Sequence, residues 1–411
     1  MKTYLVGGAV RDRLLGLTPK ERDWVVVGAS PKDLLQAGYT QVGKDFPVFL
    51  HPETKEEYAL ARTERKSGKG YHGFEVHADP AVTLEEDLLR RDLTINAMAE
   101  DEQGNLIDPY GGKTDLQAKI LRHVSPAFTE DPLRVLRVAR FAARFQHLGF
   151  QLADETRQLL CAMSRSGELN ALVPERIWQE WQRSLSEQNP EQFILLLRQC
   201  GALEVIIPEL DKLFGVPNPP EYHPEIDSGI HTIMTLQVAS QLSDDPCVRF
   251  AALVHDLGKA QTAMNEWPKH QGHEQSGLLV IRELCSRLRI PTAYRELALL
   301  ACEHHLNIHR FANLRPETRV KLLEKTDAFR RRERFHDLLL VCQADAQGVG
   351  GTMRAYPQLA GWEYLLAECD KIQARELLSQ GFEGIQLKQE LHQRRVACAK
   401  LIESMRIKNE K

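Results

Sequence analysis

The spacing of the apolar residues changes once along the chain, near Pro126, and this change limits the folds that the chain can adopt. Before it, short β-branched or aromatic runs alternate with Gly and Pro, as is typical of strands joined by turns. After it, apolar residues recur at intervals of three and four, which predicts helices. The strands are expected at 4–6, 24–27, 47–50, 58–61 and 74–77. We therefore predict an α+β protein with a small mixed α/β head and a mostly helical remainder.

The length of 411 residues exceeds what one compact core usually holds, since cores rarely grow past about 300 residues. A Pro-rich segment at 217–224 separates one helical block from a second, and nine of the fifteen histidines lie between His223 and His336. The predicted domains are a head (1–125), a helical neck and body (126–220), a histidine-rich domain (225–346) and a helical C-terminal tail (347–411).

The composition excludes several classes of protein. A formal net charge of -4 excludes a general polyanion-coating protein, so any nucleic acid must be held by local basic patches. The eight cysteines lie far apart without a CxxC pair, which indicates reduced thiols. No apolar run approaches the roughly 18 residues of a membrane helix. We expect a cytoplasmic protein, a monomer or weak homodimer, that makes no membrane contact.

The first candidate site lies in the predicted head. Gly7 and Gly8 follow a strand, so that backbone N–H groups could approach a phosphate and Arg11 could clamp it. Glu21 and Asp23 lead into the next strand, where residues two apart point to one face, as a shared Mg²⁺ requires. An ordinary glycine turn and a polar strand start are the alternatives.

A third carboxylate is expected from Glu57 at the head of a later strand, with Glu53 and Glu56 as competitors.

A predicted helix beginning at Pro132, with Asp131 as its N-cap, carries an arginine face. Its four arginines fall within an arc of about 120° at 100° per residue. As a bare pattern, such an arginine face is usually a solvated surface. The arginines are Arg134, Arg137, Arg140 and Arg144.

Together these motifs resemble the class II tRNA nucleotidyltransferases of the DNA polymerase β superfamily, which comprise CCA-adding enzymes and bacterial poly(A) polymerases. The resemblance covers roughly the first 150 residues, and the motifs stand in the family's order. One departure is Glu21, where the family usually has Asp. The matching pieces are Gly7-Gly8-x-Val10-Arg11-Asp12, Glu21-x-Asp23, Arg91-Asp92-x-Thr94-x-Asn96-Ala97 and Glu130-Asp131-x-x-Arg134.

The resemblance implies a polymerase β-like head and a role for each matching residue. Glu21 and Asp23 are implied to hold Mg²⁺ while an RNA 3′-hydroxyl attacks the α-phosphate of CTP or ATP and pyrophosphate leaves. Asp131 and Arg134 are implied to read the base of the incoming nucleotide. The residues implied to bind phosphate and ribose are Gly8, Arg11, Arg91 and Asp92, with Asn96 in the same motif and Arg137 and Arg140 behind it.

The second constellation is built around His255-Asp256, which follows an apolar run and precedes Gly258, expected to end the helix, and Lys259. Imidazole and carboxylate together suit Mg²⁺ or a transition metal. The dipeptide His336-Asp337 has no following Gly-Lys and is interpreted as an ordinary surface pair.

Over residues 228–346 the pattern resembles the HD phosphohydrolase superfamily, which implies an all-α HD domain. The implied ligands are His231, His255, Asp256 and Asp345, with His273 and His305 as further ones, for Mg²⁺, Ni²⁺, Mn²⁺ or Co²⁺. Lys259 is implied to bind the substrate phosphate. The alternative is a degenerate HD fold that binds no metal.

The pairing of the two folds resembles the bacterial multifunctional CCA proteins. It implies addition and repair of the 3′-terminal CCA of tRNA, joined to phosphatase, 2′-nucleotidase and 2′,3′-cyclic phosphodiesterase activity. The expected partners are CTP, ATP and the acceptor arm and 3′ end of tRNA, along the Arg134–Arg144 face and the basic stretch 388–411. A poly(A) polymerase and a non-catalytic RNA-binding or nucleotide-sensing protein are the alternatives.

Overall fold

A computed structural model of the chain describes residues 1–411 except 20, 43–47, 67–73, 78, 221–225, 350–354 and 410–411, and no side chains at 64–66, 74–77 and 405–409. Contacts divide it into two compact units, Met1–Ile206 and Ile207–Lys411. The described part of 207–220, which the sequence predicts to belong to the neck and body, therefore packs with the second unit. The four predicted domain ranges stay predictions, and the boundary expected at 220–225 falls largely outside the described residues.

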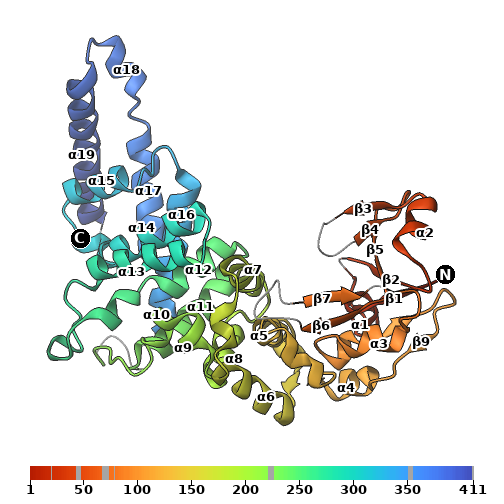
Figure 1. Cartoon of the computed structure of the whole chain (residues 1–411). Coiled ribbons are helices and arrows are strands. Elements are labelled where there is room, and N and C mark those ends of the chain that lie inside the picture. The colour runs from red at the N-terminus through yellow and green to blue at the C-terminus, as the bar shows by residue number, and fades with distance from the viewer. Residues whose placement is uncertain are drawn as a thin grey trace. The chain divides into compact units, whose positions relative to one another are not determined.

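The head of the first unit is built on one seven-stranded sheet with the order β3-β4-β5-β2-β1-β8-β9 (Figure 1). The five strands that the sequence predicts are present as β1, β2, β4, β5 and β7. Pro47, at the start of one predicted strand, lies outside the described residues. The strands are β1 Lys2–Val6, β2 Asp23–Val27, β3 Thr40–Val42, β4 Val48–Leu50, β5 Glu57–Leu60, β8 Ala99–Glu100 and β9 Leu106–Ile107, with a separate hairpin of β6 Thr63–Lys66 and β7 Phe74–His77 and a parallel pair of β10 Ile120–Leu121 and β11 Gln151–Leu152.

Strand register brings the acidic residues of the head together. β1 and β2 are antiparallel, and Val6 lies opposite Asp23. Gly7 directly follows Val6, so the glycine turn begins next to Asp23. β2 and β5 are parallel with Asp23 opposite Glu57. Directly opposed residues on neighbouring strands point to the same face. The sheet therefore places Glu57 beside Asp23.

Each face of the sheet carries its own apolar core, because inward and outward side chains alternate along the strands. One core includes Val6, Val25 and Leu88 from α3, and the other includes Val26, Phe49 and Leu34 from α2. The helices of the first unit are α1 Gly8–Leu14, α2 Pro31–Gln36, α3 Leu84–Leu89, α4 Gly112–Ala118, α5 Arg134–Phe145, α6 Asp154–Arg165, α7 Pro174–Leu185, α8 Glu191–Gln199 and α9 Ala202–Ile206, with 3-10 turns η2 Thr94–Asn96, η3 Pro126–Glu130, η4 Gln146–Leu148 and η5 Glu168–Ala171.

The arginine-bearing helix α5 begins at Arg134, two residues later than predicted, and Asp131 is not its N-cap. The Asp131 carboxylate instead accepts a hydrogen bond from the backbone N–H of Leu133 (3.0 Å), within an extended turn before the helix. α5 packs against both α7 and α8, and its apolar face is buried. The helix is therefore present as predicted, except that its first predicted turn is replaced by the hydrogen bond between Leu133 N–H and the Asp131 carboxylate.

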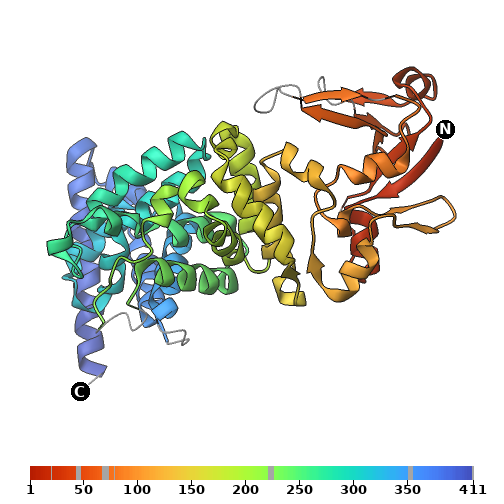
Figure 2. The ribbon, with the colours of Figure 1, turned by 60° about the horizontal axis from the view of Figure 1, so that its bottom comes forward.

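In the described residues of the second unit, all regular elements are helical apart from one bridge. α11, α12, α14 and α16 pack together, and α19 packs on α15, α17 and α18 at the edge of the unit (Figure 2). The helices are α10 Pro208–Asp211, α11 Ser228–Leu242, α12 Pro246–Val254, α13 His273–Arg287, α14 Thr292–His309, α15 Pro316–Lys325, α16 Arg332–Gly348, α17 Pro357–Asp370, α18 Ala374–Ser379 and α19 Gly384–Asn409, with 3-10 turns η6 Leu257–Gln261, η7 Met264–Glu266 and η8 Phe311–Asn313.

Three further expectations can be compared with the fold. All eight cysteines carry free thiols, as predicted. His336 is an exposed residue paired with Glu363, with 2.8 Å between His336 Nδ1 and Glu363 Oε1, which confirms its interpretation as a surface group. Among the described residues, no helix combines the length and apolarity needed to cross a bilayer.

Candidate active sites

A pocket of about 520 Å³ in the first unit collects nearly all of the predicted head-site residues. Ten arginines and four carboxylates line it, so its wall is strongly cationic with a small acidic patch. Such a wall suits a polyphosphate that carries a divalent cation. The predicted residues on the wall are Gly8, Arg11, Glu21, Asp23, Arg91, Asp92, Asn96, Asp131, Arg134, Arg137 and Arg140.

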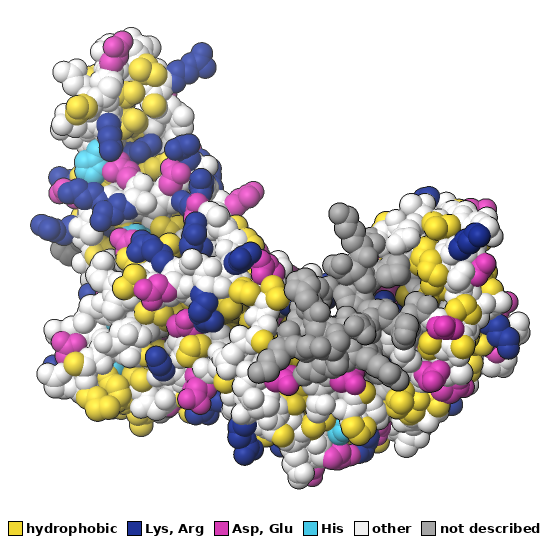
Figure 3. Space-filling model, in the orientation of Figure 1, with side chains coloured by type: hydrophobic (Ala, Val, Ile, Leu, Met, Phe, Trp, Pro, Cys, Tyr) yellow, Lys and Arg dark blue, Asp and Glu magenta, His cyan; other side chains and the backbone are white. Residues whose placement is uncertain are grey.

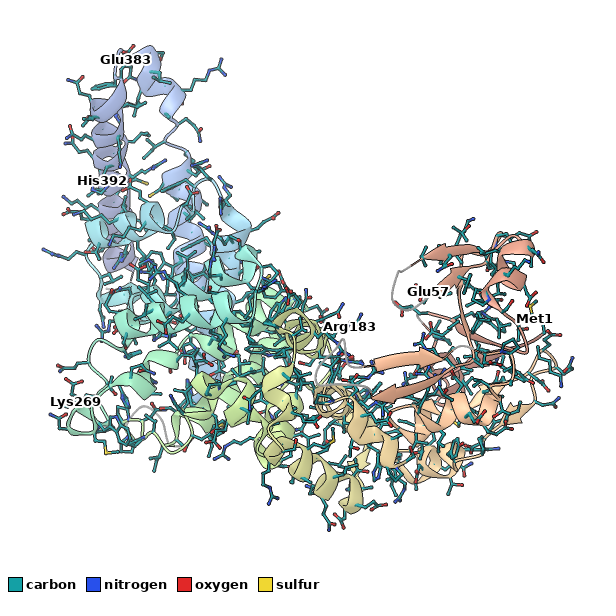
Figure 4. The ribbon with its side chains drawn as sticks, in the orientation of Figure 1. Met1, Glu57, Arg183, Lys269, Glu383 and His392 are labelled. Atoms are coloured by element: carbon teal, nitrogen blue, oxygen red, sulfur yellow. The ribbon has the colours of Figure 1, made fainter. Side chains whose placement is uncertain are left out.

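The acidic patch of this pocket has the properties of a cation site. Burial raises the pKa of Asp23, Arg91 opposes that rise, and the nearby charge of Glu21 adds to it. Two carboxylates that repel one another are stabilised by a bound divalent cation. Glu57, at the head of β5 (Figure 4), lines a smaller cavity together with Asp23. The residues present therefore fit a metal ion held by Asp23 and Glu21, with Glu57 adjacent.

The competing acids of the same strand segment face elsewhere. Glu56 accepts a hydrogen bond from the indole N–H of Trp24 (2.8 Å), and Trp24 stacks on Tyr58. Glu53 is exposed in the preceding turn. Alternation along the strand thus separates Glu57 from Glu56.

Asp92 is fully occupied by protein partners. Its Oδ1 accepts from the backbone N–H of Leu93 (2.8 Å) and from Asn96 Nδ2 (2.9 Å), and its Oδ2 accepts from Arg137 Nε (2.9 Å) and Nη2 (2.7 Å). Burial opposes the charge, but Arg137 and these hydrogen bonds lower the pKa of Asp92 below its usual range. A carboxylate accepts about four hydrogen bonds. Asp92 therefore orients Arg137, and its predicted contact with the nucleotide stays a prediction.

Arg11 is also held inside the wall. Its Nε donates to Asp12 Oδ1 (2.9 Å), its Nη1 donates to Asn96 Oδ1, and its guanidinium lies 5.3 Å and 5.0 Å from the ring centroids of Phe141 and Phe145. Burial lowers the pKa of Arg11, and Asp12 opposes this effect. These partners orient Arg11 where it lines the pocket.

The two residues implied to read the base are fixed as well. Asp131 Oδ2 accepts from Arg176 Nη2 (3.0 Å), in addition to the Oδ1 bond already described. Arg134 donates from Nη1 to the carbonyl of Ala127 (2.8 Å) and from Nη2 to the carbonyl of Arg90 (2.6 Å). Both side chains border the pocket, so a carboxylate and a guanidinium are presented there in defined positions.

The second unit brings all six predicted histidine and aspartate ligands into one buried cluster. His231 lies on α11, His255 and Asp256 follow α12, His273 begins α13, His305 lies on α14 and Asp345 lies on α16. His231 Nε2 is 2.8 Å from Asp345 Oδ1, and His273 Nε2 is 3.4 Å from Asp256 Oδ1. Three overlapping groups have ligand atoms within 4.8 Å of one another: His231, His255 and Asp256; His255, His305 and Asp345; and Asp256, His273 and His305.

Hydrogen bonds orient the cluster's imidazoles for metal binding. His255 Nδ1 lies 2.8 Å from the carbonyl oxygen of Ala252, and His273 Nδ1 lies 2.9 Å from that of His270. His305 Nδ1 lies 3.0 Å from the carbonyl oxygen of Ala301. A carbonyl only accepts, so each Nδ1 donates and each Nε2 is directed to the cluster.

Two buried ligand atoms also lack a hydrogen-bond partner among the described residues: Nε2 of His255 and Oδ1 of Asp256. Such atoms are rare unless an ion or water satisfies them. The donor set therefore fits one or more divalent cations.

Charge at the cluster points to the same conclusion. Burial opposes protonation of His255, but Asp256 and Asp345 outweigh it and raise its pKa to about 10. Burial lowers the pKa of His305 to about 3 despite the same two carboxylates. The two carboxylates thus favour positive charge at the centre of the cluster, and a divalent cation supplies it on displacing a proton.

Lys259, implied to bind the substrate phosphate, is largely buried and engaged within the cluster. Its Nζ lies 2.6 Å from Asp256 Oδ2 and donates to Asn218 Oδ1 (3.0 Å). It still borders a cavity of about 780 Å³ that also exposes Asp256, His273, His305 and Asp345. Its contact with a substrate phosphate stays a prediction.

Comparison with known proteins covers both units. Family models match the chain as a poly A polymerase head domain (3–122), a probable RNA and SrmB-binding site of polymerase A (149–214) and an HD domain (229–346). A multifunctional CCA protein of Legionella pneumophila (strain Paris) is 63% identical over 411 residues, the full length of both chains. The chain belongs to the multifunctional CCA protein family.

The fold agrees with this membership. A CCA-adding enzyme solved in its apo form II superimposes with a TM-score of 0.65 at 19% identity, covering 96% of this chain and 88% of the other. The Thermotoga maritima CCA-adding enzyme complexed with tRNA gives 0.59 at 19% identity, covering 96% and 86%. The predicted family and the α+β class are confirmed. Membership implies that the nucleotidyltransferase head and the HD domain both depend on divalent metal ions.

Sequence reasoning missed the groups that orient the site residues of this family member. α7 supplies Arg176 to Asp131 and Glu180 to Arg140, with 2.7 Å between Arg140 Nε and Glu180 Oε2. Their spacing of four residues on an amphipathic helix was the available signal.

His309 was missed in the same way, although it lies four residues after His305 on α14. Its Nε2 is 2.8 Å from Asp345 Oδ2 and its Nδ1 is 3.0 Å from the Tyr356 hydroxyl.

Gly258 does not end a helix as predicted, since α12 ends at Val254 and Gly258 lies within η6. A Cβ at Gly258 would lie 1.9 Å from the carbonyl oxygen of His273 and 2.7 Å from the backbone N of Gly277. The glycine permits close approach of α13, which positions His273.

Replacing Gly258 with alanine should therefore displace α13. We expect Gly258→Ala to lower the free energy of unfolding by about 1–3 kcal/mol and to lower the metal content of the purified protein. Thermal unfolding and elemental analysis measure the two effects. In the control Gly272→Ala the added methyl meets nothing within 4 Å, and only its left-handed φ of +78° costs stability, about 1 kcal/mol. A Gly258→Ala protein that unfolds and retains metal like the wild type would contradict this account.

Proposed function

We propose that this protein adds and repairs the 3′-terminal CCA of tRNA, using CTP and ATP and releasing pyrophosphate, and that its HD domain hydrolyses phosphoesters. The observation that carries the proposal is the 63% identity, over the full length of both chains, to a multifunctional CCA protein. Mg²⁺ is the proposed ion of the head, and Mg²⁺, Ni²⁺, Mn²⁺ or Co²⁺ that of the HD site. The proposed location is the cytoplasm.

In the transfer reaction the pocket positions two reactants. The oxygen of the RNA 3′-hydroxyl forms a bond to the α-phosphorus, the bond from that phosphorus to the bridging oxygen breaks, and pyrophosphate departs. Mg²⁺ bound by Glu21 and Asp23 would supply charge neutralisation and lower the pKa of the hydroxyl. Arg91 and Arg137, each oriented by a carboxylate, would bind phosphate oxygens.

Base selection is proposed to rest on Asp131 and Arg134. A carboxylate accepts from the exocyclic amino group that C and A share, and a guanidinium donates to a ring nitrogen or carbonyl. G and U present a different order of donors and acceptors on that edge. Because both side chains are already fixed by protein partners, selection needs no nucleic-acid template.

For the HD site we propose 2′,3′-cyclic phosphodiesterase, 2′-nucleotidase and phosphatase activity. His231, His255, Asp256 and Asp345 would hold the metal, which supplies activated water, and Lys259 would contact the phosphate. Such hydrolysis frees the 3′-hydroxyl that transfer needs. The two activities would therefore act in sequence on damaged tRNA.

The tRNA path is proposed from charge. On the face drawn in Figure 3, Lys and Arg of the second unit are interspersed with Asp and Glu. Arg394 of α19 donates to Glu390 (2.7 Å), and Arg395 lies over the ring of Phe329. The stretch 388–411 is only partly within the described residues, and with the Arg134–Arg144 face it is proposed to contact tRNA phosphates.

A tRNA shortened by its three terminal nucleotides tests the transfer function. With CTP, ATP and Mg²⁺ we expect it to gain C, C and A and then stop, as resolved on a sequencing gel. The matched control, the same tRNA with its CCA intact, should gain nothing. A long A tail would identify a poly(A) polymerase. No transfer at all would favour a non-catalytic nucleotide-sensing protein.

A further inference from the structure

Arg183 differs from the other arginines of the transfer pocket in its surroundings. Arg183 lies on α7 (Figure 4), lines the pocket and is exposed. Across the described residues its side chain has no hydrogen bond, ion pair or ring contact. By contrast, carboxylates hold the guanidinium groups of Arg11, Arg91, Arg137, Arg140, Arg144 and Arg176.

The helix α7 holds Arg183 at a defined place. Arg176, Glu180 and Arg183 recur at intervals of four and three, so they share one face of the helix. The opposite face is buried through Trp178 and Trp181. A rise of about 1.5 Å per residue puts Arg183 about 10 Å along the helix from Arg176.

The partners of α7 show at which end of the site Arg183 lies. Arg176 is bonded to Asp131, before the start of α5, and Glu180 is bonded to Arg140, in the second half of α5. α7 therefore follows α5 in the same direction. Arg183 lies beyond Glu180, away from Asp131, on the side where Arg144 of α5 is bonded to Asp12.

We infer that Arg183 is a phosphate-binding residue of the transfer site. Among the described residues no carboxylate forms an ion pair with its guanidinium, so a phosphate can pair with it without breaking one. The phosphate belongs to the incoming nucleoside triphosphate or to the RNA end, which share this chemistry. The inference rests on the proposed transfer function, although nucleotide binding alone can test it.

The experiment compares Arg183→Gln with Arg183→Lys and with Arg165→Gln. Arg165 is an exposed arginine at the end of α6 in the same unit and does not line the pocket, so it is the matched control. We measure Kd for CTP and ATP without tRNA, and then KM and kcat for nucleotides and for shortened tRNA. Thermal unfolding of each variant checks folding.

For Arg183→Gln we expect Kd and KM for both nucleotides to rise about tenfold with little change in kcat. Arg183→Lys should lie between this variant and the wild type. Unchanged nucleotide constants with a raised KM for tRNA would support the inference with the RNA as the source of the phosphate. Constants equal to those of Arg165→Gln for every substrate would overturn it. A wild type that transfers no nucleotide while Arg183→Gln binds CTP more weakly would refute the proposed function and leave the inference standing.

Discussion

Asp23→Ala is expected to lower nucleotide transfer by about a thousandfold or more, equivalent to about 4 kcal/mol of transition-state stabilisation. The variant removes the carboxylate that lies between Val6 and Glu57 in the sheet and whose pKa is raised by burial and by Glu21. Incorporation of labelled CTP into shortened tRNA measures the loss. Hydrolysis of a 2′,3′-cyclic phosphate should be unchanged, because the HD cluster belongs to the other compact unit.

The control for this variant is Glu53→Ala, which removes an exposed carboxylate from the turn before β5. It should transfer CTP at the wild-type rate. Asp23→Asn, which keeps the shape of the side chain, should be as inactive as Asp23→Ala if charge is what matters. Equal loss of transfer and hydrolysis from Asp23→Ala would point to misfolding or a shared site and would contradict the assignment.

His255→Ala should produce the reverse pattern. His255 is completely buried, and its Nε2 lies 3.3 Å from Asp256 and 3.6 Å from Asp345, so its loss opens the centre of the cluster. We expect hydrolysis to fall by about a thousandfold and bound divalent metal to fall to background after dialysis. A shortened tRNA with a 3′-hydroxyl should still be extended at the wild-type rate.

A tRNA that ends in a 2′,3′-cyclic phosphate joins the two activities in one assay. The wild type should extend it after a lag, and His255→Ala should not extend it at all. His336→Ala, which removes the exposed histidine of the other His-Asp pair, should behave as the wild type does. If the wild type never extends this substrate, the proposed sequence of hydrolysis and transfer is wrong.

Much of the architecture followed from local patterns. Strand segments such as 24–27 and 58–61 are short apolar runs between turn residues, and their identity is decided within a few positions. The change to helical spacing after Pro126 predicted the helical remainder equally well. The predicted start of α5 was two residues too early, because a hydrogen bond to the Asp131 side chain replaces the first helical turn. The spacing of apolar residues does not show such a bond.

The candidate sites divide in the same way. Motif spacing identified the residues that gather on the pocket wall and in the histidine cluster, since chemistry restricts which residue types can serve. It did not identify their protein partners. Arg176 is separated by 45 residues from Asp131, and Glu180 by 40 residues from Arg140. His309 and Asp345, which also pair, are 36 residues apart.

By itself the sequence determined the fold class and the order of the head and the HD domain, and it predicted the residue types of each candidate site. Tertiary structure decided which of three glutamates stands beside Asp23, because only the parallel register of β2 and β5 selects Glu57. It also brought His231 to Asp345, 114 residues apart. Local propensity acts over one turn or one strand, whereas such pairings depend on how whole helices and strands pack.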